Sequence, residues 1–257
     1  MKCRYILCEN YDPYWNMAFD YYFWQKCSEK KSLSILRFYK WSPSSVSIGY
    51  NQKQINLINL HFCKKNNIPI VMRPTGGSAI FHDIEITYSF CSNLSNHNSF
   101  PSPLLSYMKI CESIIKGIEK FGIKLKIRGI SEGKEPSFTE IPCFSLSSRH
   151  DIIYNDKKIV GSAQRRNNFS FLQHGSILID IRKTLWQNIF IQEIDFSKIG
   201  YLKELIGNFD EKKMINFLKS GFEDVFEFKT FEDEIGRKEA NEIESIRIKL
   251  KKEGRYE

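Results

Sequence analysis

The sequence predicts an α+β fold. Short runs rich in β-branched and aromatic residues, such as residues 34–39 and 68–72, are typical of strands. Apolar residues recur at helical spacing over residues 104–121 and 210–226, as in helices that cover a core. A hydrophobic content of 42% with 14% aromatic residues indicates a globular chain, and 257 residues are enough to bury a sizeable core.

The first part of the chain is punctuated by turn residues. Asp12-Pro13 precedes a helical pattern in which Met17, Tyr21 and Trp24 recur, and Trp41-Ser42-Pro43 separates two strand-like runs. The predicted elements are a strand over residues 2–8, a helix over 14–26, strands over 34–39 and 45–48, a helix over 55–65, and a strand over 68–72.

The second part predicts a hairpin and several amphipathic helices. Asn155-Asp156-Lys157 is the turn of the hairpin, and Gly175 interrupts the strand that follows it. The predicted elements are a loop over residues 92–103, a helix over 104–121, a strand over 123–127, a connection over 129–141, the hairpin over 151–163, a strand over 169–181, and helices over 210–226 and 231–250.

Composition excludes several classes of protein. The seven cysteines are scattered and never spaced C-x-x-C, which argues against a disulfide scaffold and a zinc site and favours a reducing cytoplasm. We expect no metal site, and no membrane association, because no apolar run approaches the length of a membrane span. The net charge of +8 suits acidic partners; the basic residues are not arranged around stacking aromatics, so we expect no nucleic acid partner.

The motif R-P-T-G-G-S-A-I-F-H-D over residues 73–83 is a candidate ligand loop. Gly76 and Gly77 let main chain approach a ligand where any Cβ would intrude. Arg73 could hold a carboxylate or a phosphate, or brace the loop, and His82 could donate a hydrogen bond or titrate. The glycine spacing matches neither a dinucleotide fingerprint nor a Walker loop.

A second candidate group lies between residues 142 and 178. Cys143 offers a thiol, and Lys158 on the predicted hairpin could lower the pKa of that thiol if the two lie together. The small residues Gly161-Ser162-Ala163 and the pair His174-Gly175 leave room for a ligand. From these residues alone the pattern favours an inert, small apolar cysteine and a solvated lysine.

Four segments together resemble the biotin/lipoyl protein ligase family: residues 12–20, 36–52, 73–83 and 157–178. The resemblance implies one catalytic domain over residues 1–257, with a core over about residues 30–228 and a C-terminal helix over 229–257. It also implies mixed and antiparallel sheets flanked by helices, related to class II synthetase cores.

Within this family the sequence is most similar to the octanoyltransferase branch. Cys143 stands in P-C-F fifteen residues before Lys158, as in that branch, and Glu85 stands where ligases more often have Asn. The resemblance implies that Cys143 accepts the acyl group and that Lys158 lowers its pKa. Ser78 replaces the third glycine of many relatives and could narrow the acyl slot.

The implied reaction moves octanoyl from octanoyl-acyl carrier protein to a lysine of a lipoyl-domain protein, such as glycine cleavage H protein or a dehydrogenase E2, with no cofactor. Backbone amides of Gly76, Gly77, Gly161 or Ser162 are the candidate oxyanion donors, and Arg73, His82 and His174 would line or brace the site.

Three other functions fit the same residues. An ATP- and Mg²⁺-dependent lipoate ligase would use Lys158 for the adenylate phosphate and leave Cys143 incidental. An amidotransferase would use Cys143 but take the acyl group from another lipoyl-domain protein. A catalytically silent binding module would be free to lose Cys143, Lys158, Arg73 and His82, all of which this chain retains.

Overall fold

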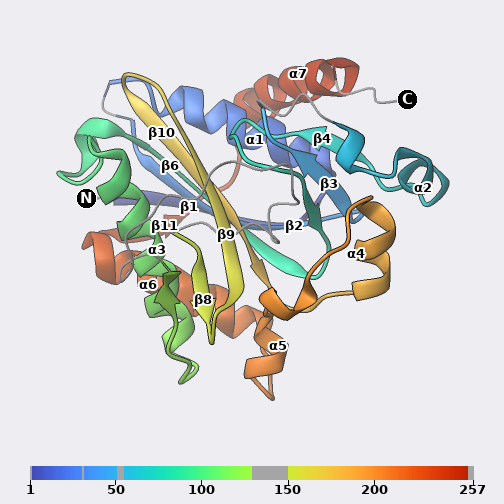
Figure 1. Cartoon of the computed structure of the whole chain (residues 1–257). Helices are drawn as coiled ribbons and strands as arrows, with labels where there is room; N and C mark the ends of the chain where they lie inside the picture. The colour runs from blue at the N-terminus through green and yellow to red at the C-terminus, as the bar shows by residue number, and fades with distance from the viewer. Residues whose placement is uncertain (1, 31, 51–54, 129–149, 254–257) are drawn as a thin grey trace.

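The computed structural model describes residues 2–30, 32–50, 55–128 and 150–253, which form two β-sheets flanked by helices (Figure 1). The strands of the larger sheet lie in the order β11-β1-β2-β6-β10-β9-β8-β7. Their bounds are β1 Lys2–Tyr11, β2 Ser34–Trp41, β6 Glu85–Asn93, β7 Lys126–Ile127, β8 Ile152–Tyr154, β9 Lys157–Arg166, β10 Ser170–Leu178 and β11 Lys229–Glu232. A smaller sheet has the order β4-β3-β5, with bounds β3 Ser45–Ile48, β4 Ile70–Met72 and β5 Ile80–His82.

Both sheets are mixed. In the larger sheet β1 pairs in parallel with β11 and β2, whereas the pairs from β2 to β7 are all antiparallel. In the smaller sheet β3 is parallel to β4 and antiparallel to β5. This arrangement confirms the predicted α+β class with mixed sheets.

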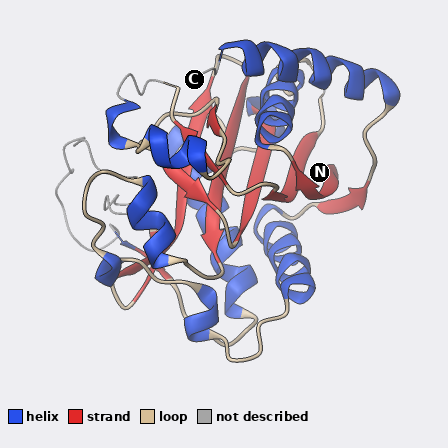
Figure 2. Ribbon diagram, turned by 90° about the vertical axis from the view of Figure 1, so that its right-hand side faces the viewer, coloured by secondary structure: helices blue, strands red, loops and turns tan. Residues whose placement is uncertain are grey.

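Helices cover both faces of the larger sheet, as Figure 2 shows from the side. The helices have the bounds α1 Pro13–Lys26, α2 Leu60–Lys65, α3 Pro103–Glu119, α4 Lys183–Ile189, α5 Leu202–Leu205, α6 Glu211–Phe226 and α7 Arg237–Glu253. Helices α3 and α6 pack on one face, over Phe38, Tyr88 and Phe90. Helix α1, backed by α7, packs on the opposite face, over Ile35 and Cys91.

A third core lies between the smaller sheet and α4, where Val46, Phe81 and Trp186 pack together with Leu178 from β10. Leu178 therefore ties the two sheets to each other. The face of the larger sheet that carries α1 is thus shared between that helix and the smaller sheet.

Strand alternation places polar residues on this shared face. In β6 the apolar residues Ile86, Tyr88 and Phe90 belong to the core under α3 and α6, so Glu85, Thr87 and their alternate neighbours turn the other way. In β10 the corresponding residues are His174 and Ser176, and all of these positions are buried. A layer of buried polar side chains follows from the pattern.

A register shift in the β8–β9 hairpin changes the direction of one lysine. Ile152 pairs with Val160 whereas Ile153 pairs with Lys158, so β9 carries one extra residue between the two pairs. Because Ile152 and Ile153 point to opposite faces, Lys158 and Val160 do so too. Val160 packs in the core under α3 and α6, and Lys158 consequently lies on the face that carries His174 and Gly161.

Sequence and structure differ at three elements. The helix predicted over residues 55–65 divides into a 3-10 turn, Ile55–Leu57, and α2, because Asn59 caps α2 through its side chain. Strand β10 runs through Gly175 without interruption, since both of its neighbours pair across that residue. The predicted C-terminal helix over residues 229–257 begins instead with strand β11, followed by α7.

Two further predictions lie outside the described residues: the connection over residues 129–141 and the position of Cys143. The division of the chain into a core over about residues 30–228 and a C-terminal part also stays a prediction. None of the helices in the described ranges combines the length and the apolar content that crossing a membrane requires.

Helices α3 and α6 cross at glycines, which leads to a prediction about stability. A Cβ at Gly221 would lie 2.2 Å from the Ser113 carbonyl oxygen, so Gly221→Ala must push the helices apart. We expect the free energy of unfolding, measured by urea titration, to fall by about 1–3 kcal/mol, more than the gain in helix propensity. Gly207→Ala is the control, because its Cβ would meet no atom within 4 Å; equal stability of the two variants would contradict the prediction.

Candidate active site

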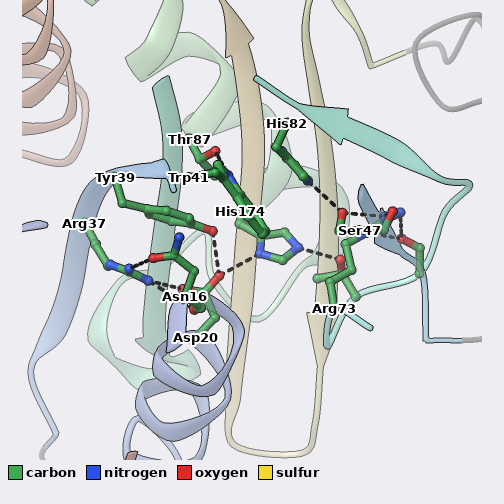
Figure 3. Close-up of polar contacts among 12 residues, drawn as sticks. Asn16, Asp20, Arg37, Tyr39, Trp41, Ser47, Arg73, His82, Thr87 and His174 are labelled. Atoms are coloured by element: carbon green, nitrogen blue, oxygen red, sulfur yellow. Dashed lines mark hydrogen bonds and ion pairs between the residues drawn. The ribbon is translucent and has the colours of Figure 1, made fainter. Parts of the chain in front are cut away.

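A pocket lies on the shared face of the larger sheet, between α1, the smaller sheet and β9–β10 (Figure 3). It encloses about 350 Å³ of space between atoms, part of it open to solvent. The residues that line it are Met17, Tyr39, Trp41, Ser47, Arg73, Ile80, His82, Thr87, Gly161, Ser162, Ala163, His174, Gly175 and Ser176. An apolar wall with a few convergent polar groups is typical of a small-molecule site.

The structure brings most of the predicted site residues together. Seven of them line the pocket: Arg73, His82, Gly161, Ser162, Ala163, His174 and Gly175. The loop residues Gly76, Gly77 and Ser78 contact Arg73 or lie beside it instead of lining the pocket, and Lys158 lies further along β9.

His174 is fixed at both ring nitrogens. Its Nδ1 lies 2.8 Å from Asp20 Oδ2, and its Nε2 lies 2.6 Å from the Thr75 hydroxyl. Because a carboxylate only accepts, we assign the proton to Nδ1, so Nε2 accepts from Thr75. Burial lowers the pKa of His174, and the positive charge of Arg73 adds to that effect against the opposing hydrogen bond and charge of Asp20. His174 is therefore neutral at neutral pH.

Asp20 is the buried carboxylate of this group. Burial by itself raises the pKa of Asp20, but the hydrogen bond from His174 and the charge of Arg37 outweigh it, so the pKa lies below its usual value. The Tyr39 hydroxyl donates to Asp20 Oδ2 at 3.1 Å, and Arg37 Nη1 lies 3.3 Å from Oδ1. Arg37 also donates to both the carbonyl and the side chain of Asn16. The anion is thus matched by donors on β2 and β10.

His82 has a parallel arrangement with Glu85. Its Nδ1 lies 2.7 Å from Glu85 Oε1 and its Nε2 lies 2.7 Å from the Ser47 hydroxyl. Thr87 and Ser176 also donate to Glu85. The indole of Trp41 donates to Thr87 at 2.8 Å, and its ring stacks on His82 with 3.9 Å between centroids. The carboxylate of Glu85 accepts hydrogen bonds from the side chains of three residues. This explains why a glutamate stands at this position.

Arg73 braces the loop that follows it. Its guanidinium makes five hydrogen bonds, to the carbonyls of Gly76 (twice), Ser78 and Ser47 and to the Ser47 hydroxyl. A guanidinium has five N–H groups, so these bonds match its donors one for one. Of the two roles predicted for Arg73, this geometry favours bracing.

Close packing of main chain accounts for two glycines. A Cβ at Gly49 would lie 2.0 Å from the Gly77 carbonyl oxygen, and Gly77 itself has a φ of 92°. A Cβ at Gly175 would lie 2.6 Å from both the Gly161 carbonyl oxygen and the Ser162 hydroxyl. The absence of a Cβ at Gly49 lets β3 approach the loop at Gly77, and its absence at Gly175 lets β10 pack closely against β9.

Hydrogen bonds on the α3 face of the sheet fix Ser162. The Tyr88 hydroxyl donates to the Ser162 hydroxyl at 2.7 Å, and the Tyr107 hydroxyl on α3 donates to the Ser162 carbonyl at 3.1 Å. Gln173 donates to Tyr88 at 3.1 Å. The backbone of β9 beside the pocket is therefore fixed by side chains from three elements.

Lys158 forms a buried ion pair with Asp151. The distance from Lys158 Nζ to Asp151 Oδ1 is 2.9 Å, and the two side chains are 4% and 3% exposed. The Arg128 amide donates to the Asp151 carbonyl, and the Gly200 amide donates to the Lys158 carbonyl, so both main chains are anchored.

Sequence reasoning missed the polar support of the pocket. Asn16 and Asp20 lie in the predicted helix over residues 14–26 and Arg37 in the predicted strand over 34–39, but no role at the site was predicted for them or for Thr87. A signal was present, since Asn16 and Asp20 are four residues apart in an otherwise apolar helix and so share one face. Within the described residues no group of His, Cys, Asp and Glu side chains is arranged to hold a metal ion.

Comparison with known proteins identifies the family. The model of the lipoyl protein ligase A/B catalytic domain matches residues 12–223. The chain therefore belongs to the lipoyl protein ligase A/B catalytic domain family.

Curated relatives share the name octanoyltransferase LipM. The protein of Carboxydothermus hydrogenoformans is 30% identical over 87% of this chain and 86% of its own length. That of Brevibacillus brevis is 37% identical over 69% of this chain, which spans 66% of that relative's length. That of Bacillus subtilis is 34% identical over 73% of this chain and 69% of its own.

Solved structures share the fold. Lipoate-protein ligase A bound with ATP superposes with a TM-score of 0.81 over 97% of this chain and 95% of its own. A chain of the bi-partite lipoate protein ligase from Thermoplasma acidophilum gives 0.78 over 97% and 93%. Both are 21% identical to this chain, so they confirm the predicted fold and carry no further argument.

The neutral, buried His174 predicts how stability depends on pH. As the pH falls below the ordinary value of 6.5, the unfolded chain takes up a proton at His174 before the folded chain does, so folding stability falls with it. Asp20 adds to the loss only below its ordinary value of 3.8. Urea unfolding at about pH 7.5 and about pH 5.5 measures the effect.

We expect the loss of stability between these pH values to be about 1 kcal/mol smaller in His174→Gln than in the unsubstituted protein. The loss in the variant is subtracted from the loss in the unsubstituted protein, so the contributions of the other titrating groups cancel. An equal loss in both proteins would show that His174 is not held neutral.

Proposed function

We propose that this protein is an octanoyltransferase of protein lipoylation, which moves an octanoyl group from octanoyl-acyl carrier protein to a lysine of a lipoyl-domain protein through a thioester on Cys143. The observation that carries the proposal is the 30–37% identity to curated octanoyltransferases over 69–87% of the chain. The retained pair of Cys143 and Lys158, fifteen residues apart, supports the covalent route.

The pocket supports an acyl substrate. Met17, Tyr39, Trp41 and Ile80 give it apolar walls, and the small residue Ala163 leaves its floor open. A saturated chain gains about 0.8 kcal/mol for each CH₂ group that it buries. His82 and His174, both hydrogen-bonded to carboxylates, form its polar end.

The reaction has two steps. The Cys143 thiolate attacks the carbonyl carbon of the donor thioester, a new carbon–sulfur bond forms, and the carrier thiolate leaves and takes up a proton. The acceptor amine then attacks the Cys143 thioester, an amide forms, and the Cys143 thiolate is released as the amine loses its proton. Amide formation from a thioester is downhill, so the cycle needs no ATP.

The guanidinium of Arg73 is occupied by five bonds to protein oxygens, so it is not available to bind a phosphate. An ATP-dependent ligase would use Lys158 for the adenylate phosphate instead, so the requirement for ATP separates the two reactions. The amidotransferase alternative differs only in its donor and shares the Cys143 thioester.

The proposed function also specifies the protein partners and the cellular compartment. The donor is octanoyl-acyl carrier protein, and the acceptor is a lipoyl-domain protein such as glycine cleavage H protein or a dehydrogenase E2. Five of the cysteines, Cys3, Cys27, Cys63, Cys91 and Cys111, are unpaired thiols, which fits the cytoplasm predicted from the sequence. No cofactor enters the proposed cycle.

Intact mass spectrometry tests the covalent step. The protein is incubated with octanoyl-acyl carrier protein without ATP or acceptor, alongside Cys143→Ala and the control Cys63→Ala, which removes a buried thiol outside the pocket. We expect a hydroxylamine-labile octanoyl increment on the unsubstituted protein and on Cys63→Ala, and none on Cys143→Ala.

An increment on all three proteins would place the acyl group elsewhere and exclude the Cys143 thioester. Product formed only with ATP and free octanoate would identify a ligase. An increment obtained only from an octanoylated lipoyl-domain protein would identify the amidotransferase.

The net charge of +8 predicts that transfer depends on salt. Acyl carrier proteins and lipoyl domains are typically acidic, so we expect kcat/KM for octanoyl-acyl carrier protein to fall roughly tenfold or more from low salt to about 0.5 M. A small uncharged octanoyl thioester is the control and should show little change. Equal salt dependence of the two donors would contradict electrostatic steering.

A further inference from the structure

The charge state of Lys158 is a question that the structure raises. Its side chain is 4% exposed, and a buried lysine without a counter-charge readily loses its proton. A neutral amine would lack the positive charge that stabilises a thiolate. A buried ammonium at this position therefore requires a nearby negative charge.

Asp151 meets that requirement by position. Its Oδ1 lies 2.9 Å from Lys158 Nζ, and its side chain is 3% exposed. Main-chain hydrogen bonds fix both residues, to Arg128 on one side and to Gly200 on the other. Lys158 also forms an isolated parallel bridge with Ile199. The pair is consequently held as a rigid unit.

The register shift determines where this unit lies. The extra residue in β9 turns Lys158 away from the core that contains Val160 and toward the face of His174 and Gly161. Bulges of this kind commonly re-aim a side chain beside a functional site. Without the shift, the ammonium would point into the apolar core under α3.

Among the described residues, two groups on α3 are affected by the charge of Asp151. Burial raises the pKa of Tyr107 and of Cys111, and the charge of Asp151 contributes further to each increase. Both are therefore neutral at neutral pH. His150 precedes Asp151 in the chain, and the Arg128 side chain donates to the Asp156 carbonyl in the hairpin turn.

We propose that Asp151 is a positioning residue that keeps Lys158 protonated and holds its ammonium on the pocket face. The inference deepens the octanoyl transfer proposed above and rests on it for the role of Lys158. Asp151 touches neither substrate nor thiol in this proposal and acts through the lysine.

The first readout is the titration of Lys158 itself, which does not depend on activity. The protein is labelled with ¹³C at lysine Cε, and the Lys158 signal is assigned from its loss in Lys158→Met. In Asp151→Asn we expect this signal to titrate at a pH lower than in the unsubstituted protein by about one unit or more. Asp156→Asn is the matched control, the same change at an exposed position of the same hairpin. An unchanged titration in Asp151→Asn would overturn the proposal.

The second readout is the rate of octanoyl transfer from the carrier thioester. We expect Asp151→Asn to lower the rate about tenfold or more, and the double variant Asp151→Asn/Lys158→Met to be no slower than Lys158→Met alone. Additive losses would mean that Asp151 acts independently of Lys158, against the proposal. If the unsubstituted protein transfers nothing, the proposed function fails, whereas the Lys158 titration still decides the role of Asp151.

Asp151→Glu serves if the Asn variant does not fold. It keeps the carboxylate but displaces it by one CH₂ group, so we expect the Lys158 titration to stay within about half a unit of the unsubstituted protein and the transfer rate to fall. A full transfer rate in Asp151→Glu would overturn the positioning role.

Discussion

Two hydrogen bonds between a histidine and a buried carboxylate, His174 to Asp20 and His82 to Glu85, hold the pocket in its shape. The first joins elements that are far apart in sequence, since Asp20 lies on α1 and His174 on β10. The second joins residues on the consecutive strands β5 and β6. Ionic groups buried without partners would destabilise the fold by several kcal/mol. The layer between the large sheet and α1 is therefore stable only as a complete set of donors and acceptors, and that completeness gives the apolar cavity rigid walls.

The need to pair buried ionic groups also explains how the β8–β9 hairpin contributes to the site. Asn155 and Asp156 both have positive φ, as a tight two-residue turn requires. Beyond the turn, the extra residue in β9 directs Lys158 out of the apolar core, where its counter-charge Asp151 meets it. Turn, register shift and ion pair act together, so the local geometry of one hairpin sets the direction of one amine and places a carboxylate beside it.

Much of the fold could be predicted from the sequence, because the strands and the long helices have strong periodicity. Strand β3 was predicted, and half of the pocket residues were predicted from motifs such as Gly161-Ser162-Ala163. The register shift in β9 was not, since nothing in K-I-V distinguishes a shifted strand from a regular one. Strand β11 was not predicted because its residues are mostly exposed and lack an apolar pattern. It is a strand because it pairs with β1. The roles of Asp20 and Asp151 depend on long-range contacts that no local pattern encodes.

The central claim is that the pocket on the α1 face holds the acyl chain during transfer. A crystal structure of the protein carrying an octanoyl thioester tests it most directly. The account predicts electron density for the chain between Met17 and Ala163, beside the stacked rings of Trp41 and His82. Density for the chain on the α3 face of the sheet, or a cavity on the α1 face that stays unchanged in the acylated protein, would contradict the account.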